Sequence, residues 1–205
     1  HIKSSIRGEK SFSARTADAF LESYLDTHPG DEVRTIDLAH AEIPEFDARA
    51  VSGKYGIMQG REHTAEEAEA WKSVTALIDD FKSADKFIFS VPMWNFGIPY
   101  RLKHFFDVIL QPGHTFSFSP KTGYEGLVTG KPVLVIAARG GEYAAGTPAE
   151  AADFQLPYLE FVLKFLGFED IKSVVVEPCL AGGPDKANDR LAAAQAEARA
   201  LATAF

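Results

Sequence analysis

Hydrophobic residues recur along the chain with two alternating periods, one typical of buried strands and the other of amphipathic helices. Short apolar runs predict strands over residues 1–5, 32–38, 87–91, 132–138 and 171–177. Apolar residues three and four positions apart predict helices over residues 13–28, 64–84, 99–110 and 154–166, followed by an alanine-rich helix after Pro184. Such an alternation of strands and helices is characteristic of α/β proteins with a parallel sheet.

Two segments have no clear period. Residues 39–63 carry small and polar side chains, which predicts a long loop with a short helix. Residues 111–127 predict an irregular excursion, in which the alternation of Phe116 and Phe118 with polar residues favours a small hairpin. Thr64 and Glu67 have the spacing of a capping box and mark the start of a helix.

Five strands, each followed by a helix, predict one flavodoxin-like, doubly wound α/β domain over residues 1–205, with helices on both faces of a five-stranded parallel sheet. Right-handed crossovers restrict the topology, and we expect the strand order 2-1-3-4-5. In this order the loops after strands one, three and four reach the same edge of the sheet. Because the chain opens on His1 rather than Met, we expect the first strand to be truncated at its amino end.

Composition narrows the classes of function. The chain has 205 residues, 46% of them apolar, and a formal net charge of −8, which is ordinary for a folded domain and unfavourable for binding nucleic acid. No apolar run approaches the roughly 18 residues of a membrane span, and a secretory signal is missing. The single cysteine, Cys179, fits a reducing compartment. We therefore expect a cytoplasmic protein without membrane insertion.

The loop after the third predicted strand carries large flat side chains. Met93, Trp94, Asn95 and Phe96 stand where such a loop normally has turn residues, and Gly97 follows them. A protein in water gains little from exposing Trp and Phe unless something flat covers them. A planar cofactor is the first hypothesis for this loop.

The loop after the first strand suits an anion. Ser5, Ser11 and Ser13 supply hydroxyl groups before a predicted helix, whose first N–H groups and dipole attract negative charge, while Arg7 and Lys10 add positive potential. The alternative is that Ser13 is merely a helix N-cap beside a solvated loop. The glycines of the dinucleotide and P-loop motifs are missing.

The loop after the fourth strand contains Arg139, Gly140 and Gly141. Paired glycines leave backbone N–H groups open to a ligand at close range, and such donors stabilise negative charge that develops on a heterocycle. The alternative is a turn that requires a positive φ. Taken together, the three loops describe a ligand with an anionic tail and a flat head, and FMN fits this description.

Other chemistry has little support in the sequence. The six histidines are scattered and give no metal site; we expect His104 to be a packing or surface residue and Cys179 a small core residue. The GxSxG elbow of serine hydrolases is absent. Hydride transfer through a flavin requires no nucleophilic side chain, which agrees with this composition.

Four segments resemble the FMN-dependent NADH-azoreductase family, which are flavodoxin-like NAD(P)H:quinone oxidoreductases. PMWNFGIPYRLKHFFD at residues 92–107 resembles the family signature PM[YW]NF.IP..LK..FD. EGLVTGKPVLVIAARGG at residues 125–141 is similar to a second signature that ends in an [ST]RGG-type loop. SSIRGEKSFSARTADAF at residues 4–20 and LPYLEFVLKFLGFEDIKSVVVE at residues 156–177 resemble its phosphate loop and its closing helix and strand.

The resemblance implies a role for each loop, with the chemistry taking place at N5 of FMN and no catalytic side chain assigned. The residues implied for the FMN phosphate and ribityl chain are Ser5, Ser11, Phe12 and Ser13. Those implied to line the isoalloxazine, with a backbone N–H near N5, are Met93, Trp94, Asn95 and Phe96. Those implied for the pyrimidine edge are Ala138, Arg139, Gly140 and Gly141.

The chain departs from the family pattern at three positions. Phe12 and Ala138 stand where members often have polar residues, and Tyr143 stands where some members have His. The resemblance also implies a homodimer whose active sites are built from both subunits. Phe105, Phe118 and Tyr124, together with Tyr143, are then candidates to face the dimer or the substrate, with core packing as the alternative for these aromatic residues.

The activity that the resemblance implies is a two-electron, ping-pong transfer from NADH or NADPH to quinones, azo compounds or both. Two other classes stay open on the residues alone. One is a flavodoxin-like one-electron carrier, which shares the fold and the acidic charge. The other is a binding or regulatory module without flavin.

Overall fold

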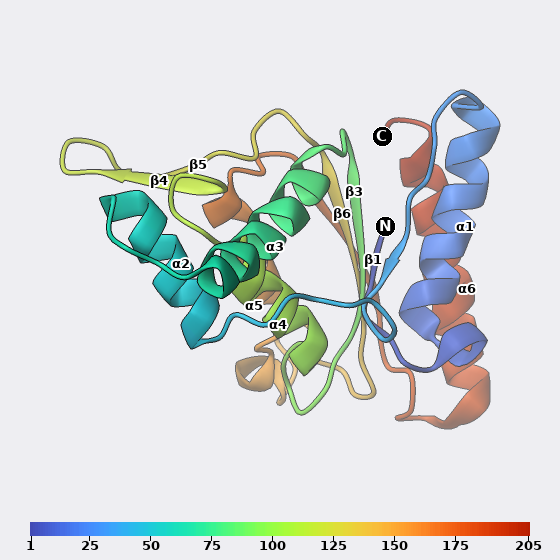
Figure 1. Cartoon of the computed structure of the whole chain (residues 1–205). Helices are drawn as coiled ribbons and strands as arrows, with labels where there is room; N and C mark the ends of the chain where they lie inside the picture. The colour runs from blue at the N-terminus through green and yellow to red at the C-terminus, as the bar shows by residue number, and fades with distance from the viewer.

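A five-stranded parallel sheet forms the centre of the computed structural model, which describes all 205 residues (Figure 1). Its strands, in spatial order, are β2 (Ile36–Asp37), β1 (Ile2–Lys3), β3 (Phe87–Pro92), β6 (Val133–Ala138) and β7 (Ile171–Val176). The strands β4 (Phe116–Ser119) and β5 (Gly123–Gly126) form a separate antiparallel hairpin. Without the hairpin the order is 2-1-3-4-5, which confirms the predicted topology.

Helices lie against both faces of this sheet (Figure 1). One face packs against α1 (Phe12–Thr27) and α6 (Gly183–Ala202). The other packs against α3 (Ala65–Lys82), α4 (Tyr100–Ile109) and α5 (Leu156–Leu166), and α2 (Ala48–Gln59) lies on α3. Short 3-10 turns, η1 (Gly8–Lys10) and η2 (Glu150–Ala152), precede α1 and α5. None of the helices combines the length and the apolar character needed to cross a lipid bilayer.

Two hydrophobic cores result, one on each face of the sheet. Successive side chains of β3 alternate between them: Phe87 and Phe89 pack toward α3 and α4, whereas Ile88 packs toward α1 and α6. All six residues of β6 are buried. A strand buried on both sides reads as a nearly continuous apolar run, which is why β3 and β6 are visible in the sequence.

Some predicted boundaries were wrong. The second strand, expected over residues 32–38, is limited to Ile36–Asp37, because its only partner, β1, pairs over two residues. The expected short helix in residues 39–63 has 12 residues; Asp47 caps its start and Gly60, at φ 63°, ends it. The helix expected from residue 154 begins at Leu156, because the Asp153 carboxylate accepts the N–H groups of Gln155 and Leu156. The capping box is confirmed by both hydrogen bonds between Thr64 and Glu67.

The hairpin predicted in the excursion is confirmed and projects from the body of the molecule (Figure 1). Its base is fixed to the end of α5, where the N–H of Val128 donates to the carbonyl of Leu166 at 2.8 Å. Phe116 also packs on Phe165 of α5, with ring centroids 4.8 Å apart. The backbones of Gly126 and Gly167 approach so closely there that neither position has room for a side chain.

We expect Gly126→Ala to lower the free energy of unfolding by about 1–3 kcal/mol, because the new Cβ forces the two backbones apart. That Cβ would lie 2.2 Å from the amide nitrogen of Gly167. The measurement is urea unfolding followed by circular dichroism. Gly30→Ala is the matched control, since its Cβ meets nothing within 4 Å and Gly30 lacks a positive φ. Equal stability of the two variants would contradict the close approach.

Candidate functional site

The carboxyl ends of β1, β3 and β6 lie side by side, because these three strands are neighbours in the sheet. Hydrogen bonds join the chain segments that leave them. The N–H of Ser4 donates to the carbonyl of Ser90 at 3.1 Å, and the N–H of Met93 donates to the carbonyl of Ala138 at 2.8 Å. The structure therefore brings together the three loops in which the sequence placed its candidate residues.

Buried hydroxyl groups line the loop after β1. Ser5, Ser11 and Ser13 are all buried, and the Oγ atoms of Ser11 and Ser13 are 3.2 Å apart. Ser11 is the N-cap of α1, since its Oγ accepts the N–H of Ala14. The alternative interpretation, in which Ser13 is merely the cap, is therefore wrong, and the Ser13 hydroxyl remains without a capping role.

The first turn of α1 has backbone N–H groups that lack a protein acceptor. The N–H groups of Phe12 and Ser13 donate to no protein acceptor, as expected for the start of a helix. Two free amides at the positive end of a 16-residue helix, beside two buried hydroxyl groups, form a set of donors with the chemistry that a phosphate requires. The Phe12 side chain is only partly buried, and its backbone is the part of the residue that can serve an anion.

The loop after β3 is a tight, strained turn. Trp94 and Gly97 exchange both backbone hydrogen bonds, at 2.9 and 3.0 Å. Between them, Asn95 has φ 47° and Phe96 has φ 71°, in the left-handed region that side chains other than those of Gly, Asn and Asp rarely adopt. Their N–H groups donate to no protein acceptor, and the Phe96 side chain is 52% exposed. Strain of this kind is concentrated at functional sites.

The loop after β6 contributes two further free donors. Neither Gly140 nor Gly141 has a positive φ, so the alternative of a turn that requires one is wrong. Space explains Gly140 better: a Cβ there would lie 3.1 Å from Cδ1 of Leu180. The N–H groups of both glycines donate to no protein acceptor. The loop thus offers accessible amides, as the sequence indicated.

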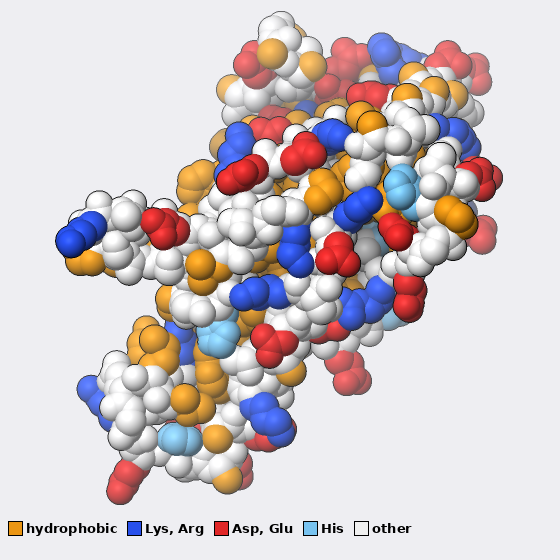
Figure 2. All heavy atoms as spheres, turned by 90° about the horizontal axis from the view of Figure 1, so that it is seen from above, with side chains coloured by type: hydrophobic (Ala, Val, Ile, Leu, Met, Phe, Trp, Pro, Cys, Tyr) orange, Lys and Arg blue, Asp and Glu red, His pale blue; other side chains and the backbone are white.

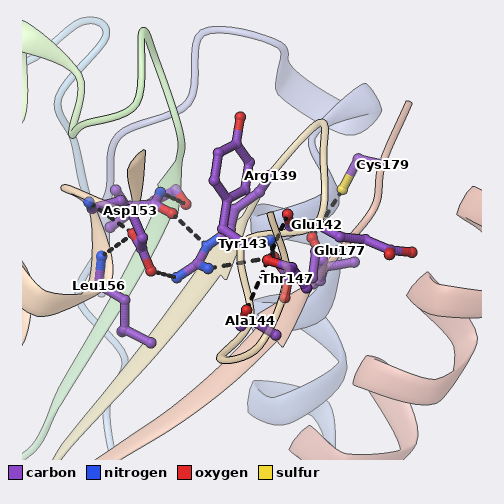
Figure 3. A network of polar contacts seen from close by, with 12 residues as sticks. Arg139, Glu142, Tyr143, Ala144, Thr147, Asp153, Leu156, Glu177 and Cys179 are labelled. Carbon is purple, nitrogen blue, oxygen red and sulfur yellow. Dashed lines mark hydrogen bonds and ion pairs between the residues drawn. The ribbon is translucent and has the colours of Figure 1, made fainter. Parts of the chain in front are cut away.

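Arg139 is engaged within the protein. Its side chain is 2% exposed and lies between Asp153 and Glu177, at 2.8 and 3.3 Å (Figure 3). Its N–H donates to Val176 in β7, and its carbonyl accepts the N–H of Cys179. Among the four residues implied for the pyrimidine edge, Gly140 and Gly141 are therefore the ones with free donors.

The residues that are candidates to face the dimer or the substrate lie in different environments. Phe105 is fully buried in the core between α4 and the sheet, so the core-packing alternative is correct for it. Phe118 and Tyr124 are exposed on the hairpin, away from the three loops, with ring centroids 4.9 Å apart. Tyr143 lies at the site and meets the edge of Phe96 at 6.4 Å.

A cavity of about 1030 Å³ opens beside the turn after β3, and neither of the other two loops lines it. Its lining comes from the turn after β3, from α4, and from α2 and the segment before it; it includes Trp94, Asn95, Lys54, Phe46, His104 and Phe116. The sequence did not predict this cavity, because residues 39–63 carry no period that orients α2. Figure 2, which views the molecule from above, shows the hairpin standing out from the body, with acidic and basic side chains interspersed over the face in view.

Two side chains on which the sequence had suggested little chemistry are held in place. His104 Nε2 lies 3.0 Å from the carbonyl oxygen of Pro44, a packing contact between α4 and the segment before α2. The thiol of Cys179 donates to the carbonyl of Val176, and burial raises its pKa to about 11. At neutral pH Cys179 is therefore protonated and a poor nucleophile.

Comparisons with known proteins agree with this geometry. A family model described as a flavodoxin-like fold matches residues 1–202. The FMN-dependent NADH:quinone oxidoreductase of Nitratidesulfovibrio vulgaris (strain DP4) is 53% identical over 205 residues, which is 100% of this chain and 98% of that protein. The enzyme of the same name from Desulfotalea psychrophila is 47% identical over 202 residues, covering 98% and 94%.

Two solved structures are also similar. An azoreductase from Bacillus anthracis str. Sterne superposes with a TM-score of 0.90 at 32% identity, covering 100% of this chain and 97% of that one. An FMN-dependent NADH-azoreductase from Bacillus anthracis str. Ames Ancestor, in complex with FMN, gives a TM-score of 0.86 at 28% identity, covering 98% and 97%.

We expect the free energy of unfolding of Phe96→Gly to be about 1 kcal/mol higher than that of Phe96→Ala. Both variants remove the aromatic ring, but only glycine relieves the cost of φ 71°. The measurement is urea unfolding of the protein without added ligand. Equal stability of the two variants would show that the turn relaxes without cost.

Proposed function

The chain belongs to the flavodoxin-like family of FMN-dependent NADH:quinone oxidoreductases, and we propose that it has this activity itself. One observation carries the proposal: three neighbouring loops each present backbone N–H groups without a protein acceptor. They include the N–H groups of Phe12, Ser13, Asn95, Phe96, Gly140 and Gly141. Phe12, Ser13, Gly140 and Gly141 are buried or half-buried, whereas Asn95 and Phe96 are exposed. Buried or half-buried donors without partners are uncommon, and a ligand with several acceptors accounts for those in the loops after β1 and β6.

The loop after β1 is proposed to hold the FMN phosphate. The amides of Phe12 and Ser13 and the hydroxyl groups of Ser5, Ser11 and Ser13 donate to its oxygens. The dipole of α1 and the positive charges of Arg7 and Lys10 favour a dianion there. Because the serines are buried, these hydrogen bonds are shielded from water, and each is stronger than it would be at an exposed site.

The turn after β3 and the loop after β6 are proposed to hold the flat ring. When bound, FMN would supply the redox chemistry of a two-electron, ping-pong transfer from NADH or NADPH to an acceptor. The turn after β3, with Met93, Trp94 and Phe96, lines the ring and places the Asn95 and Phe96 amides near N5. Gly140 and Gly141 donate to the pyrimidine edge and stabilise the negative charge that develops on it.

Flat acceptors suit the surroundings of this site. The side chains of Trp94, Phe96 and Tyr143 offer aromatic faces and edges, each worth about 1 kcal/mol against a well-placed ring. Quinones and azo compounds are planar and conjugated, and we propose both as acceptors. These aromatic side chains would limit the access of water to the ring and the loss of reducing equivalents to solvent.

We also propose that the protein works as a cytoplasmic homodimer. The exposed aromatic residues Phe118 and Tyr124 stand on the projecting hairpin, where they are too far from the three loops of their own chain to serve them. A second copy that covers the cavity beside Trp94 would bury them and complete the walls of the site. Cys179, held as a thiol, is compatible with a reducing compartment.

The experiment that tests the activity is an absorbance spectrum followed by stopped-flow mixing. We expect FMN-reconstituted protein to show a flavin spectrum that is bleached by NADH and restored by a quinone or an azo dye. NADPH in a parallel run gives the preference between the two dinucleotides. Protein that binds FMN but fails to oxidise either would favour the one-electron carrier, and protein that gains no FMN would favour the flavin-free module.

Ser11→Ala should weaken FMN binding beyond its effect on folding. The variant loses the cap of α1, which costs about 1 kcal/mol of stability, and also a proposed phosphate donor. Thr64→Ala is the matched control, because Thr64 caps α3 in the same way away from the three loops. We expect fluorescence titration to give a raised FMN dissociation constant for Ser11→Ala only. An unchanged constant for both would place the phosphate elsewhere.

A further inference from the structure

One short segment, residues 153–155, contacts both loops that are proposed to hold the flavin ring. It lies directly before α5, far along the chain from the turn after β3. The N–H of Phe154 donates to the carbonyl of Phe96 at 3.0 Å, so the segment holds the strained turn by its backbone. Asp153 forms the ion pair with Arg139 and thereby holds the loop after β6.

Gln155 connects the ends of two strands through a single side chain. Its Nε2 donates to the carbonyl of Val91, at the end of β3, at 3.0 Å. Its Oε1 accepts the Nε–H of Arg139, just after β6, at 3.1 Å. The residue is fully buried, so water cannot replace either hydrogen bond.

Arg139 links Gln155 to the loop that follows β6. Its guanidinium lies between Asp153 and Glu177, and the same Glu177 oxygen that pairs with it accepts the N–H of Tyr143 at 2.9 Å (Figure 3). The loop from Arg139 to Tyr143 is therefore fixed at both ends, with Gly140 and Gly141 between them. Displacing Arg139 moves the glycine amides.

We propose that Gln155 is a positioning residue of the flavin site, which sets the spacing between the turn after β3 and the amides of Gly140 and Gly141. The inference rests on the proposed function. Amides stabilise charge on a ligand only at hydrogen-bonding distance and with suitable alignment. A change in this spacing therefore alters both the affinity for FMN and the stability of its reduced, more negative form.

The test uses Gln155→Met, which keeps the approximate volume and removes both hydrogen bonds. Gln155 is chosen over Asp153 and Glu177, because loss of either carboxylate changes the charge of the buried cluster as well as its hydrogen bonds. Gln155→Asn, which keeps the amide but is too short to reach both partners, is the second variant in case Gln155→Met does not fold. Tyr24→Phe is the matched control: it removes a buried hydroxyl that joins Asp31 and Lys86 at the opposite edge of the sheet.

Three quantities are measured for each variant: the thermal midpoint without FMN, the FMN dissociation constant, and the flavin reduction potential. We expect the Gln155 variants to raise the dissociation constant about tenfold, the equivalent of one lost hydrogen bond, and to shift the potential to a more negative value. Tyr24→Phe should lower the thermal midpoint by about as much as the Gln155 variants do. It should leave the FMN dissociation constant and the flavin reduction potential unchanged.

Unchanged affinity and potential in the Gln155 variants would reduce the role of the residue to folding alone and overturn the inference. The proposed function would survive that result, because it depends on the wild-type protein. A wild-type protein that binds no FMN would overturn both. The two failures are therefore distinguishable in one set of titrations.

Discussion

The burial of β3 and β6 on both faces is the constraint on which the rest of this structure depends. With helices packed against each side, no ligand can reach the sheet except at the ends of its strands. The carboxyl ends of β1, β3 and β6 are adjacent, so the segments that leave them share one small region. A ligand that requires donors for a phosphate, a ring nitrogen and a ring edge finds all three there, each from a different strand.

This arrangement has a cost in the isolated chain. Asn95 and Phe96 are held at positive φ, and their amides, like those of Gly140 and Gly141, have no acceptor in the protein. Such features persist where the surroundings determine the backbone more strongly than its local preference does. Here the surroundings are identifiable: the paired bonds of Trp94 with Gly97, and the bond from Phe154 to the strained turn. The conformation of the turn is thus fixed both by its own backbone hydrogen bonds and by the segment before α5.

The sequence predicts the parts of this architecture that depend on local pattern. Apolar runs identify β3 and β6, and the serines, aromatic residues and glycines identify the three loops. The extent of β2 escapes prediction because it is set by pairing with β1. The short helix expected in residues 39–63 is present as α2, but its bounds escape prediction because its segment has no period. Phe105 illustrates the same limit. Both Phe105 and Phe106 of α4 are buried, and the sequence alone does not say that both side chains face the core. The link through Gln155 joins residues 64 positions apart and leaves no local pattern.

The buried ion cluster clarifies how this site acts on a ligand. Arg139 appears in the sequence as a positive charge beside the glycines, yet two carboxylates compensate it, and the cluster carries no net positive charge toward a bound ring. In the proposed function, stabilisation of negative charge on the ring therefore falls to the amide dipoles of Gly140 and Gly141. The field of a dipole falls off faster with distance than that of a charge, and it depends on orientation. A site that relies on dipoles requires an accurately placed loop, and a buried network with Arg139 at its centre supplies that accuracy.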